Sequence, residues 1–270
     1  MEKMIITVAP TGNVPTKQNN PQVPITPDEI AEDIYQCYLA GASVAHIHAR
    51  DGYGKPTTEP AVFKDIADRV KSKCNIIIQM STGARGGTPQ ERGACLELKP
   101  EMASLATCSS NFSSSVNYNP PDLIKSLAQK MLENSIKPEV EVFDTAALYF
   151  AEYLASEGLL KKPLHYNLVM NVPGSIKGSP KNLFFLLESL PDYCTWTVSG
   201  IGKSHQQITG LAIVLGGNVR VGIEDVIELE KGFPVSNILL VKRVVDLAKA
   251  YGRKIADANE ARAILGLQGQ

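Results

Sequence analysis

Short apolar runs rich in β-branched residues alternate along the chain with longer segments whose apolar positions recur at helical spacing. This alternation is typical of a parallel sheet in which a helix follows each strand. Eight strands are expected, over Met4–Val8, Val44–Ala49, Asn75–Ser81, Met102–Ala106, Glu139–Phe143, His165–Met170, Thr195–Ser199 and Val219–Gly222. Helices are expected from the cap Thr26 to Leu39 or Ala40 and over Glu59–Lys71, Pro89–Leu96, Pro120–Asn134, Ala146–Glu157, Ser179–Ser189, His205–Leu215, Asn237–Gly252 and Ala258–Leu265.

Eight such units in 270 residues favour one (β/α)₈ TIM barrel that spans residues 1–270 as a single domain. A doubly wound open sheet would show the same alternation. No shift in composition marks a linker, and the polar stretch Thr11–Pro24 is expected to be a long loop after the first strand. Because a barrel carries its chemistry where the strands end, polar residues at those positions are the candidates for function.

Charge narrows the class of partner. The chain has 27 basic and 28 acidic residues, a formal net charge of −1, so no global field would attract nucleic acid or an anionic membrane. No apolar run approaches the roughly 20 residues of a membrane span, and the N-terminus lacks the pattern of a signal peptide. A cytoplasmic enzyme that binds small molecules and other subunits is expected.

Five scattered cysteines, none in a CxxC pair, argue against a disulfide framework and against a thiolate zinc site. Histidines offer a better metal site. His46 and His48 lie two apart on a predicted strand, which places both rings on one face near its carboxyl end. Two imidazoles suit a divalent ion such as zinc, with manganese or cobalt as alternatives. The structural alternative is one hydrogen-bonded histidine and one that merely packs.

A carboxylate from another strand end would complete the site. Glu224 follows the last predicted strand and is the expected third ligand. Asp225 beside it would serve as a general base, and Arg220 would hold that carboxylate or neutralise a substrate anion. A surface ion cluster is the alternative. Two histidines and one carboxylate leave coordination positions open, as catalytic metals require.

Three further segments carry polar groups near predicted strand ends. The loop Ser81–Gly87 offers amides and hydroxyls that suit a carboxylate or a phosphate. Gly200–Ser204 resembles a phosphate loop, but Thr197 stands where that motif needs glycine, so a nucleotide P-loop is rejected. Glu141 lies between Val140 and Val142 and is expected to point into the barrel. His165, at the start of its strand, is expected to be structural, and His205 is a weaker site candidate.

Seven segments taken together resemble the β-keto acid cleavage enzymes, a family that includes the 3-keto-5-aminohexanoate cleavage enzyme of lysine fermentation. The resemblance runs from Met4 to about Leu265 in the same order and with nearly the same spacings. The segments are Thr11–Gly12, Pro24–Pro27, His46–Asp51, Gln79–Gly83, Lys99–Ala103, Pro138–Glu141 and Arg220–Asp225.

The resemblance implies a TIM barrel with one zinc ion that converts a β-keto acid and acetyl-CoA into acetoacetate and a new acyl-CoA. Acetyl-CoA is then a cosubstrate, and no redox cofactor takes part. Family members are often homo-oligomers, frequently tetramers. By position, the zinc ligands are His46, His48 and Glu224, and the catalytic residues are Asp225 as base, Arg220 as its support, and Ser81. The positions matched to substrate binding are Ser81, Thr82, Gly83, Ser104 in place of a threonine, Glu141 and Val14.

Two departures from the family pattern, at Val14 and Ala106, bear on substrate binding. The aminohexanoate enzyme has a glutamate facing the ammonium group of its substrate, and Val14 occupies that position here. A substrate without a cationic tail is therefore expected. An asparagine that holds the substrate carboxylate is matched by Ala106, and Thr107, Cys108 or Asn111 are candidates to replace it.

Two other functions stay open from the residues alone. A zinc-dependent aldolase or hydrolase would use the same ligands on the same barrel. A barrel retained for binding or assembly would keep the metal site as a relic, and His46→Ala would then leave turnover unchanged.

Overall fold

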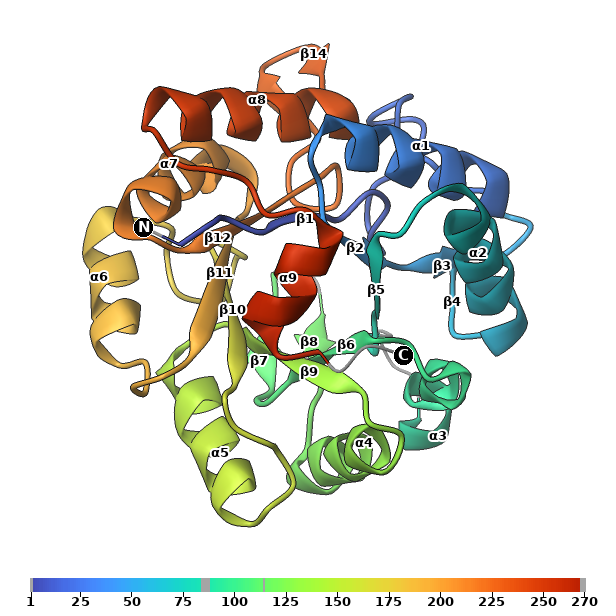
Figure 1. Cartoon of the computed structure of the whole chain (residues 1–270). Coiled ribbons are helices and arrows are strands. Elements are labelled where there is room, and N and C mark those ends of the chain that lie inside the picture. Colours follow the sequence, from blue (N-terminus) through green and yellow to red (C-terminus); the bar gives the residue numbers. More distant parts are fainter. Residues whose placement is uncertain (1, 84–87, 114, 268–270) are drawn as a thin grey trace.

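The computed structural model describes residues 2–83, 88–113 and 115–267, and its centre is a closed barrel of eight parallel strands (Figure 1). β1 pairs with β12 in parallel, Ile6 opposite Val219, and this pairing closes the barrel. The (β/α)₈ prediction is therefore confirmed, and the open sheet is excluded. Around the barrel the strands are β1 (Ile6–Val8), β12 (Asn218–Val221), β11 (Thr195–Gly200), β10 (His165–Met170), β9 (Lys137–Val142), β6 (Met102–Ala106), β5 (Ile77–Met80) and β2 (Val44–Ile47).

Helices surround the barrel on its outer side (Figure 1). α1 shows why they form where expected: Thr26 and Glu29 make a reciprocal capping box, and Gly41 ends the helix in a left-handed conformation. The helices are α1 (Pro27–Ala40), α2 (Pro60–Lys73), α3 (Pro89–Arg92), α4 (Pro121–Glu133), α5 (Thr145–Ser156), α6 (Pro180–Glu188), α7 (His205–Leu215), α8 (Asn237–Ala250) and α9 (Ala258–Leu265).

Two predicted elements are corrected. The helix expected over Pro89–Leu96 is the single turn of α3 followed by a 3₁₀ helix, Ala94–Leu98, with Gly93 between them. The strand expected over Val44–Ala49 leaves the barrel after Ile47. Its continuation β3 (Ala49–Arg50) pairs instead with β4 (Pro56–Thr57) in a small hairpin.

Two more small hairpins follow barrel strands and were not predicted. They are β7 (Ser110–Asn111) with β8 (Val116–Asn117), and β13 (Glu228–Glu230) with β14 (Phe233–Pro234). Runs of two or three residues leave no periodicity to read, which is why the sequence does not indicate them.

The barrel is filled at its amino-terminal end by apolar side chains. Ile5, Val44, Ile77 and Met102 point inward and pack against Ala261 and Leu265, together with other residues near the C-terminus. α9 lies across this end of the barrel (Figure 1). The opposite end, where the strands terminate, is left for the polar residues identified from the sequence. Within the described residues, no helix has the length and apolar character needed to cross a membrane.

Candidate active site

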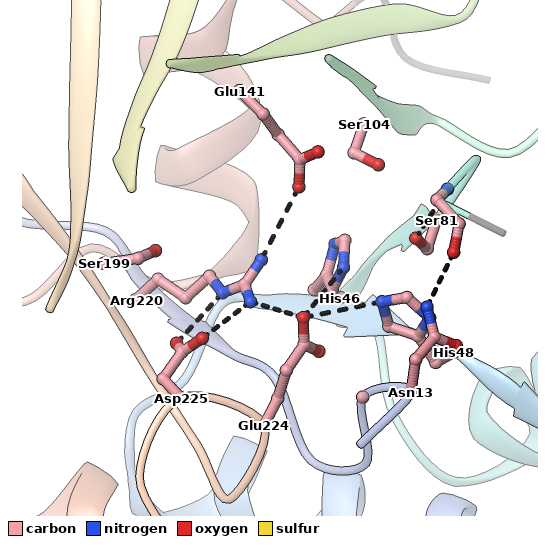
Figure 2. A network of polar contacts seen from close by, with 12 residues as sticks. Asn13, His46, His48, Ser81, Ser104, Glu141, Ser199, Arg220, Glu224 and Asp225 are labelled. Carbon is pink, nitrogen blue, oxygen red and sulfur yellow. Dashed lines mark hydrogen bonds and ion pairs between the residues drawn. The ribbon is translucent and has the colours of Figure 1, made fainter. Parts of the chain in front are cut away.

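His46, His48 and Glu224 meet at the carboxyl end of the barrel (Figure 2). β2 and β12 flank β1 on either side, so residues at the ends of these two strands are brought close together. The Nε2 atoms of His46 and His48 lie 3.8 Å and 3.4 Å from Glu224 Oε1. One ligand atom from each residue lies within 4.8 Å of the other two, which is the spacing of donors around a single ion.

Hydrogen bonding sets the tautomer of His46. Its Nδ1 lies 2.6 Å from Gln79 Oε1, which can only accept, so Nδ1 carries the proton. Burial, together with the positive charge of the nearby Arg220, lowers the pKa of His46 to about 4. The other ring atom, Nε2, is buried without a hydrogen-bond partner among the described residues. A neutral imidazole with an unused lone pair is the form that binds a metal.

Glu224 is prepared as an anion. Burial alone would raise the pKa of its carboxyl, but Arg220, His48 and His46 hold that pKa well below its usual range. Its Oε2 is a second buried atom without a hydrogen-bond partner in the described part of the chain. The three residues thus fit a divalent cation by donor type, protonation and unused donor atoms.

Arg220 joins the Glu224 carboxylate to two other carboxylates (Figure 2). Its Nε and Nη2 donate to both oxygens of Asp225, at 3.1 Å and 2.8 Å, and Nη2 also donates to Glu224 at 2.6 Å. Glu141 Oε1 lies 4.0 Å from its Nη1. Burial raises the pKa of Asp225 to about 6 and that of Glu141 to about 7, against the opposing effect of Arg220. Three carboxylates around one guanidinium leave a net negative site, which suits a cation.

The predicted carboxylate-binding residues lie beside this site. Thr82 Oγ1 donates to Ser104 O at 2.8 Å, and the Gly83 amide donates to Ser81 Oγ at 3.1 Å. These bonds tie the end of β5 to β6 and hold the Ser81 hydroxyl next to the histidines (Figure 2). Residues 84–87 of this predicted loop lie outside the described residues.

The two departures from the family pattern lie at the same end of the barrel. Val14 is on the loop after β1, with 57% of its surface exposed. Ala106 is buried at the end of β6. The hydroxyl of Thr107 donates to Ala147 O at 2.7 Å, so it is not the group that replaces the missing asparagine.

The remaining histidines do not join the cluster. His165 Nε2 lies 3.3 Å from Glu139 Oε2 inside the barrel, and its Nδ1 lies 2.8 Å from Thr195 Oγ1, in line with the structural role expected of it. His205 is buried against the backbone, with Nδ1 3.1 Å from Gly200 O. In the segment Gly200–Ser204, the Gly202 amide donates to Asp225 O at 2.9 Å and so supports the backbone beneath the candidate base.

Comparison with known proteins identifies the family. The sequence pattern of the beta-keto acid cleavage enzymes matches residues 3–267. The chain belongs to this family. It is 44% identical over 271 residues to the 3-keto-5-aminohexanoate cleavage enzyme of Acetoanaerobium sticklandii, with 99% of each chain covered. It is 40% identical to the 3-oxoadipate:acetyl-CoA acetyltransferase of Cupriavidus necator, over 97% of this chain and 94% of that one.

Solved structures agree on the fold of this β-keto acid cleavage enzyme. ObcA in its binary complex with oxaloacetate superposes with a TM-score of 0.79 at 23% identity, covering 92% of this chain and 68% of that one. At that identity the likeness concerns the barrel alone.

Several polar groups around the family site were given no role by sequence reasoning. Gln79 orients His46, and Asn13 Nδ2 donates to Gly83 O at 2.7 Å from the loop after β1. Glu139, buried inside the barrel, lies among the charges that act on His46. Gln79 and Glu139 alternate with outward-facing apolar residues on their strands, a pattern that could have identified them as inward-facing. Asn13 is on an irregular loop and has no such signal.

Proposed function

We propose that this chain is a divalent metal-dependent, most simply zinc-dependent, transferase that acts on a β-keto acid and acetyl-CoA. The bond between C2 and C3 of R–CO–CH₂–COO⁻ breaks, and the acyl group R–CO passes to CoA. The CH₂–COO⁻ unit passes to the acetyl group, which gives acetoacetate. The observation that carries the proposal is the convergence of three metal-type donors, two of them with unused buried atoms, beside a carboxylate held by Arg220.

His46, His48 and Glu224 would hold the ion, which acts as a Lewis acid on the substrate keto oxygen when bound. Asp225 would be the base that removes a proton from the β-keto acid. Because Arg220 engages both of its oxygens, the Asp225 carboxylate has a fixed orientation, as a positioned base requires. Arg220 also offsets part of the negative charge of the site, which reduces the repulsion of an anionic substrate.

The substrate carboxylate is assigned to the end of β5. The Ser81 hydroxyl accepts a hydrogen bond from the Gly83 amide and so has its own proton to donate there. Thr82 fastens this segment to Ser104 on the neighbouring strand. Holding the carboxylate at this place fixes C2 and C3 relative to the base, which lowers the entropic cost of a reaction between two molecules. Glu141, buried beside Arg220, would line the same space.

An uncharged tail on the acyl group is part of the proposal. Val14 presents no charge to a substrate ammonium. The strand ends near Glu141 also carry an apolar cluster of Ala106, Phe143 and Val169, with Phe112, Val172 and Ile201 packed against it. An ammonium group against such a surface would lose water without gaining a partner.

The deciding experiment measures acetoacetate and acyl-CoA formation from acetyl-CoA and β-keto acids with neutral, anionic and cationic tails, with and without a chelator. Chelator-sensitive turnover that favours neutral tails supports the whole proposal. A metal-bound protein that turns over no β-keto acid would contradict it and favour an aldolase or hydrolase. A protein that binds no metal and turns over none of these acids would favour a barrel retained for binding, with the metal site as a relic.

The specificity statement has its own test in Val14→Glu, with Val14→Gln as the control of equal length. The glutamate should raise relative kcat/KM for 3-keto-5-aminohexanoate about fivefold, because an exposed ion pair contributes about 1 kcal/mol. Equal effects of Gln and Glu would mean that charge at this position does not select the substrate.

A cytoplasmic location and a homo-oligomeric state, with a tetramer as the expected form, remain predictions from the sequence and the family. Analytical ultracentrifugation of the purified protein tests the second.

A further inference from the structure

Arg50 is a buried arginine two residues beyond His48, and its guanidinium binds only backbone oxygens in the hydrogen bonds described for it. Nε and Nη2 donate to Gly12 O at 2.9 Å and 2.7 Å, and Nη2 also donates to Pro15 O at 2.9 Å. Nη1 donates to Gly54 O at 2.9 Å, in the turn between β3 and β4. Glu224 and Asp51 act on this guanidinium through their charges, but all the hydrogen bonds described for it go to neutral carbonyls. A buried charge bonded in this way is a costly means of fastening a loop, so another benefit is expected from this arrangement.

The loop that Arg50 fastens touches both sides of the candidate active site. Gly12 has φ +63° and packs so tightly on the metal-site carboxylate that a Cβ there would lie 2.6 Å from Glu224 Cγ. Asn13, the next residue, donates from its side chain to Gly83 O, in the proposed carboxylate-binding segment. Figure 2 shows Asn13 between Glu224 and Ser81, beside His48. One short loop therefore contacts the third metal ligand with one residue and the substrate segment with the next.

We propose that Arg50 is a positioning residue that holds the loop Thr11–Pro15 against Glu224 and Gly83, and so fixes the metal site and the substrate segment relative to each other. The inference rests on the proposed function for its kinetic readout, whereas its metal-binding readout stands without it. The planar fork of arginine is essential to this role, because the carbonyls of Gly12, Pro15 and Gly54 are reached from three nitrogens at once. A lysine would keep the charge but could not span these acceptors.

The test compares Arg50→Lys with Arg253→Lys. Arg253 is an equally buried arginine whose hydrogen bonds also go to backbone carbonyls, those of Glu2, Ile213, Gly216 and Gly217 at the amino-terminal end of the barrel. Zinc affinity is measured by competition with a chelator, thermal unfolding by calorimetry, and KM separately for the keto acid and for acetyl-CoA.

Both variants should be less stable than the wild type. Arg50→Lys alone should bind zinc about 10–100-fold more weakly, the usual cost of disturbing groups that orient a metal ligand, and should raise KM for the keto acid more than KM for acetyl-CoA. If Arg50→Lys loses stability as Arg253→Lys does but keeps wild-type zinc affinity and KM, the proposal is overturned. If no variant and no wild-type sample turns over a keto acid, the proposed function fails while the zinc titration still decides the role of Arg50.

Two variants keep the test decisive should Arg50→Lys fail to fold. Asn13→Ala removes only the link to Gly83, so it should raise KM for the keto acid and leave zinc affinity unchanged. Gly12→Ala places a methyl group against Glu224, so it should weaken zinc binding. Wild-type zinc affinity in Gly12→Ala together with wild-type KM in Asn13→Ala would show that the loop does not transmit position.

Discussion

On one side of the barrel, Ile5 just before β1 and the first residues of β2, β5 and β6, which are Val44, Ile77 and Met102, point inward at the amino-terminal end, where α9 covers them. On the other side, β9, β10 and β11 turn polar residues inward: Glu139, His165, Asn167, Thr197 and Ser199, all buried. We call the side of the barrel formed by β1, β2, β5 and β6 the apolar half, and the side formed by β9, β10 and β11 the polar half. In the apolar half, polar side chains begin only one inward position later, at His46 and Gln79.

The polar half is held together by a chain of hydrogen bonds. Ser199 Oγ donates to Asn167 Oδ1 at 2.8 Å, and Asn167 Nδ2 donates to Glu139 Oε1 at 3.1 Å. His165 continues the chain from the other Glu139 oxygen, 3.3 Å away. Substituting one member of this chain would leave a buried polar group without its partner. Packing alone fills the apolar half, whereas the polar half depends on contacts between buried polar side chains.

The largest effect on metal binding and turnover is expected at His46, the first polar inward-facing residue of β2. His46→Ala should abolish stoichiometric zinc binding and lower turnover by about a thousandfold or more, because a lost Lewis acid removes several kcal/mol of transition-state stabilisation. Metal analysis and steady-state kinetics on the same preparation check both. Full turnover without bound metal would contradict the assignment and revive the view of this site as a relic.

Gln79 is the next inward-facing residue after Ile77 on β5. Its substitution tests whether this polar side chain supports the metal site. Gln79→Leu removes the acceptor that fixes the His46 tautomer and should weaken zinc binding about 10–100-fold. Gln79→Glu keeps an acceptor oxygen and should retain tight binding. Equal affinities for the Leu variant and the wild type would separate Gln79 from the site.

Glu139 tests the pairing in the polar half. Burial raises the pKa of this carboxyl, but His165, with His46 and Arg220, lowers it to about 2. A folded-state pKa below the usual 4.5 stabilises the protein above about pH 4.5, and that stabilisation is lost as the pH falls toward 2.

Glu139→Gln should therefore reduce the free energy of unfolding by about 1–3 kcal/mol at neutral pH, and the difference from wild type should shrink in acid. Urea titrations at a series of pH values measure this. A difference that stays constant from pH 7 to pH 3 would argue against an ionised Glu139.

The smallest effect is expected in the apolar half. Ile77 is fully buried, and Ile77→Val should lower the free energy of unfolding by about 0.5–1.5 kcal/mol through the lost methylene alone. Zinc affinity and kcat/KM should stay at wild-type values. A change in either would mean that packing in this half also positions the site.

The strand ends and the interior of the barrel differ in how far the sequence predicts their contacts. The eight barrel strands and the meeting of His46, His48 and Glu224 were predicted, because strand-end positions in a parallel barrel converge whatever the exact register. Partners within the barrel depend on register. The contacts of Glu139 with Asn167 and His165 follow from how β9 and β10 align, which a single sequence does not encode locally.

The geometry of the loops could not be predicted from the sequence either. The segment His46–Asp51 marks Arg50 as part of a family motif, but its acceptors on Gly12 and Pro15 lie on a loop more than thirty residues away along the chain. They are backbone atoms, which leave no residue-type signal. The end of β2 at Ile47 was missed for a similar reason. Ala49 was expected to continue this strand, but it belongs to β3 and pairs with β4 in the hairpin.

His46, His48 and Glu224 lie on either side of β1 in the barrel but far apart along the chain. His46 and His48 are synthesised before β5, whereas Glu224 is synthesised only after β12. A nascent chain therefore lacks the complete set of candidate donors until all eight barrel strands have been synthesised, and an ion that needs all three donors would bind only after that point. An ion bound there would close a loop that contains most of the chain, the situation in which a metal clip restricts the unfolded state most strongly. In cells starved of zinc, chains without the ion should open more readily where β1 pairs with β2 and β12. These chains would be the first to be exposed to proteolysis.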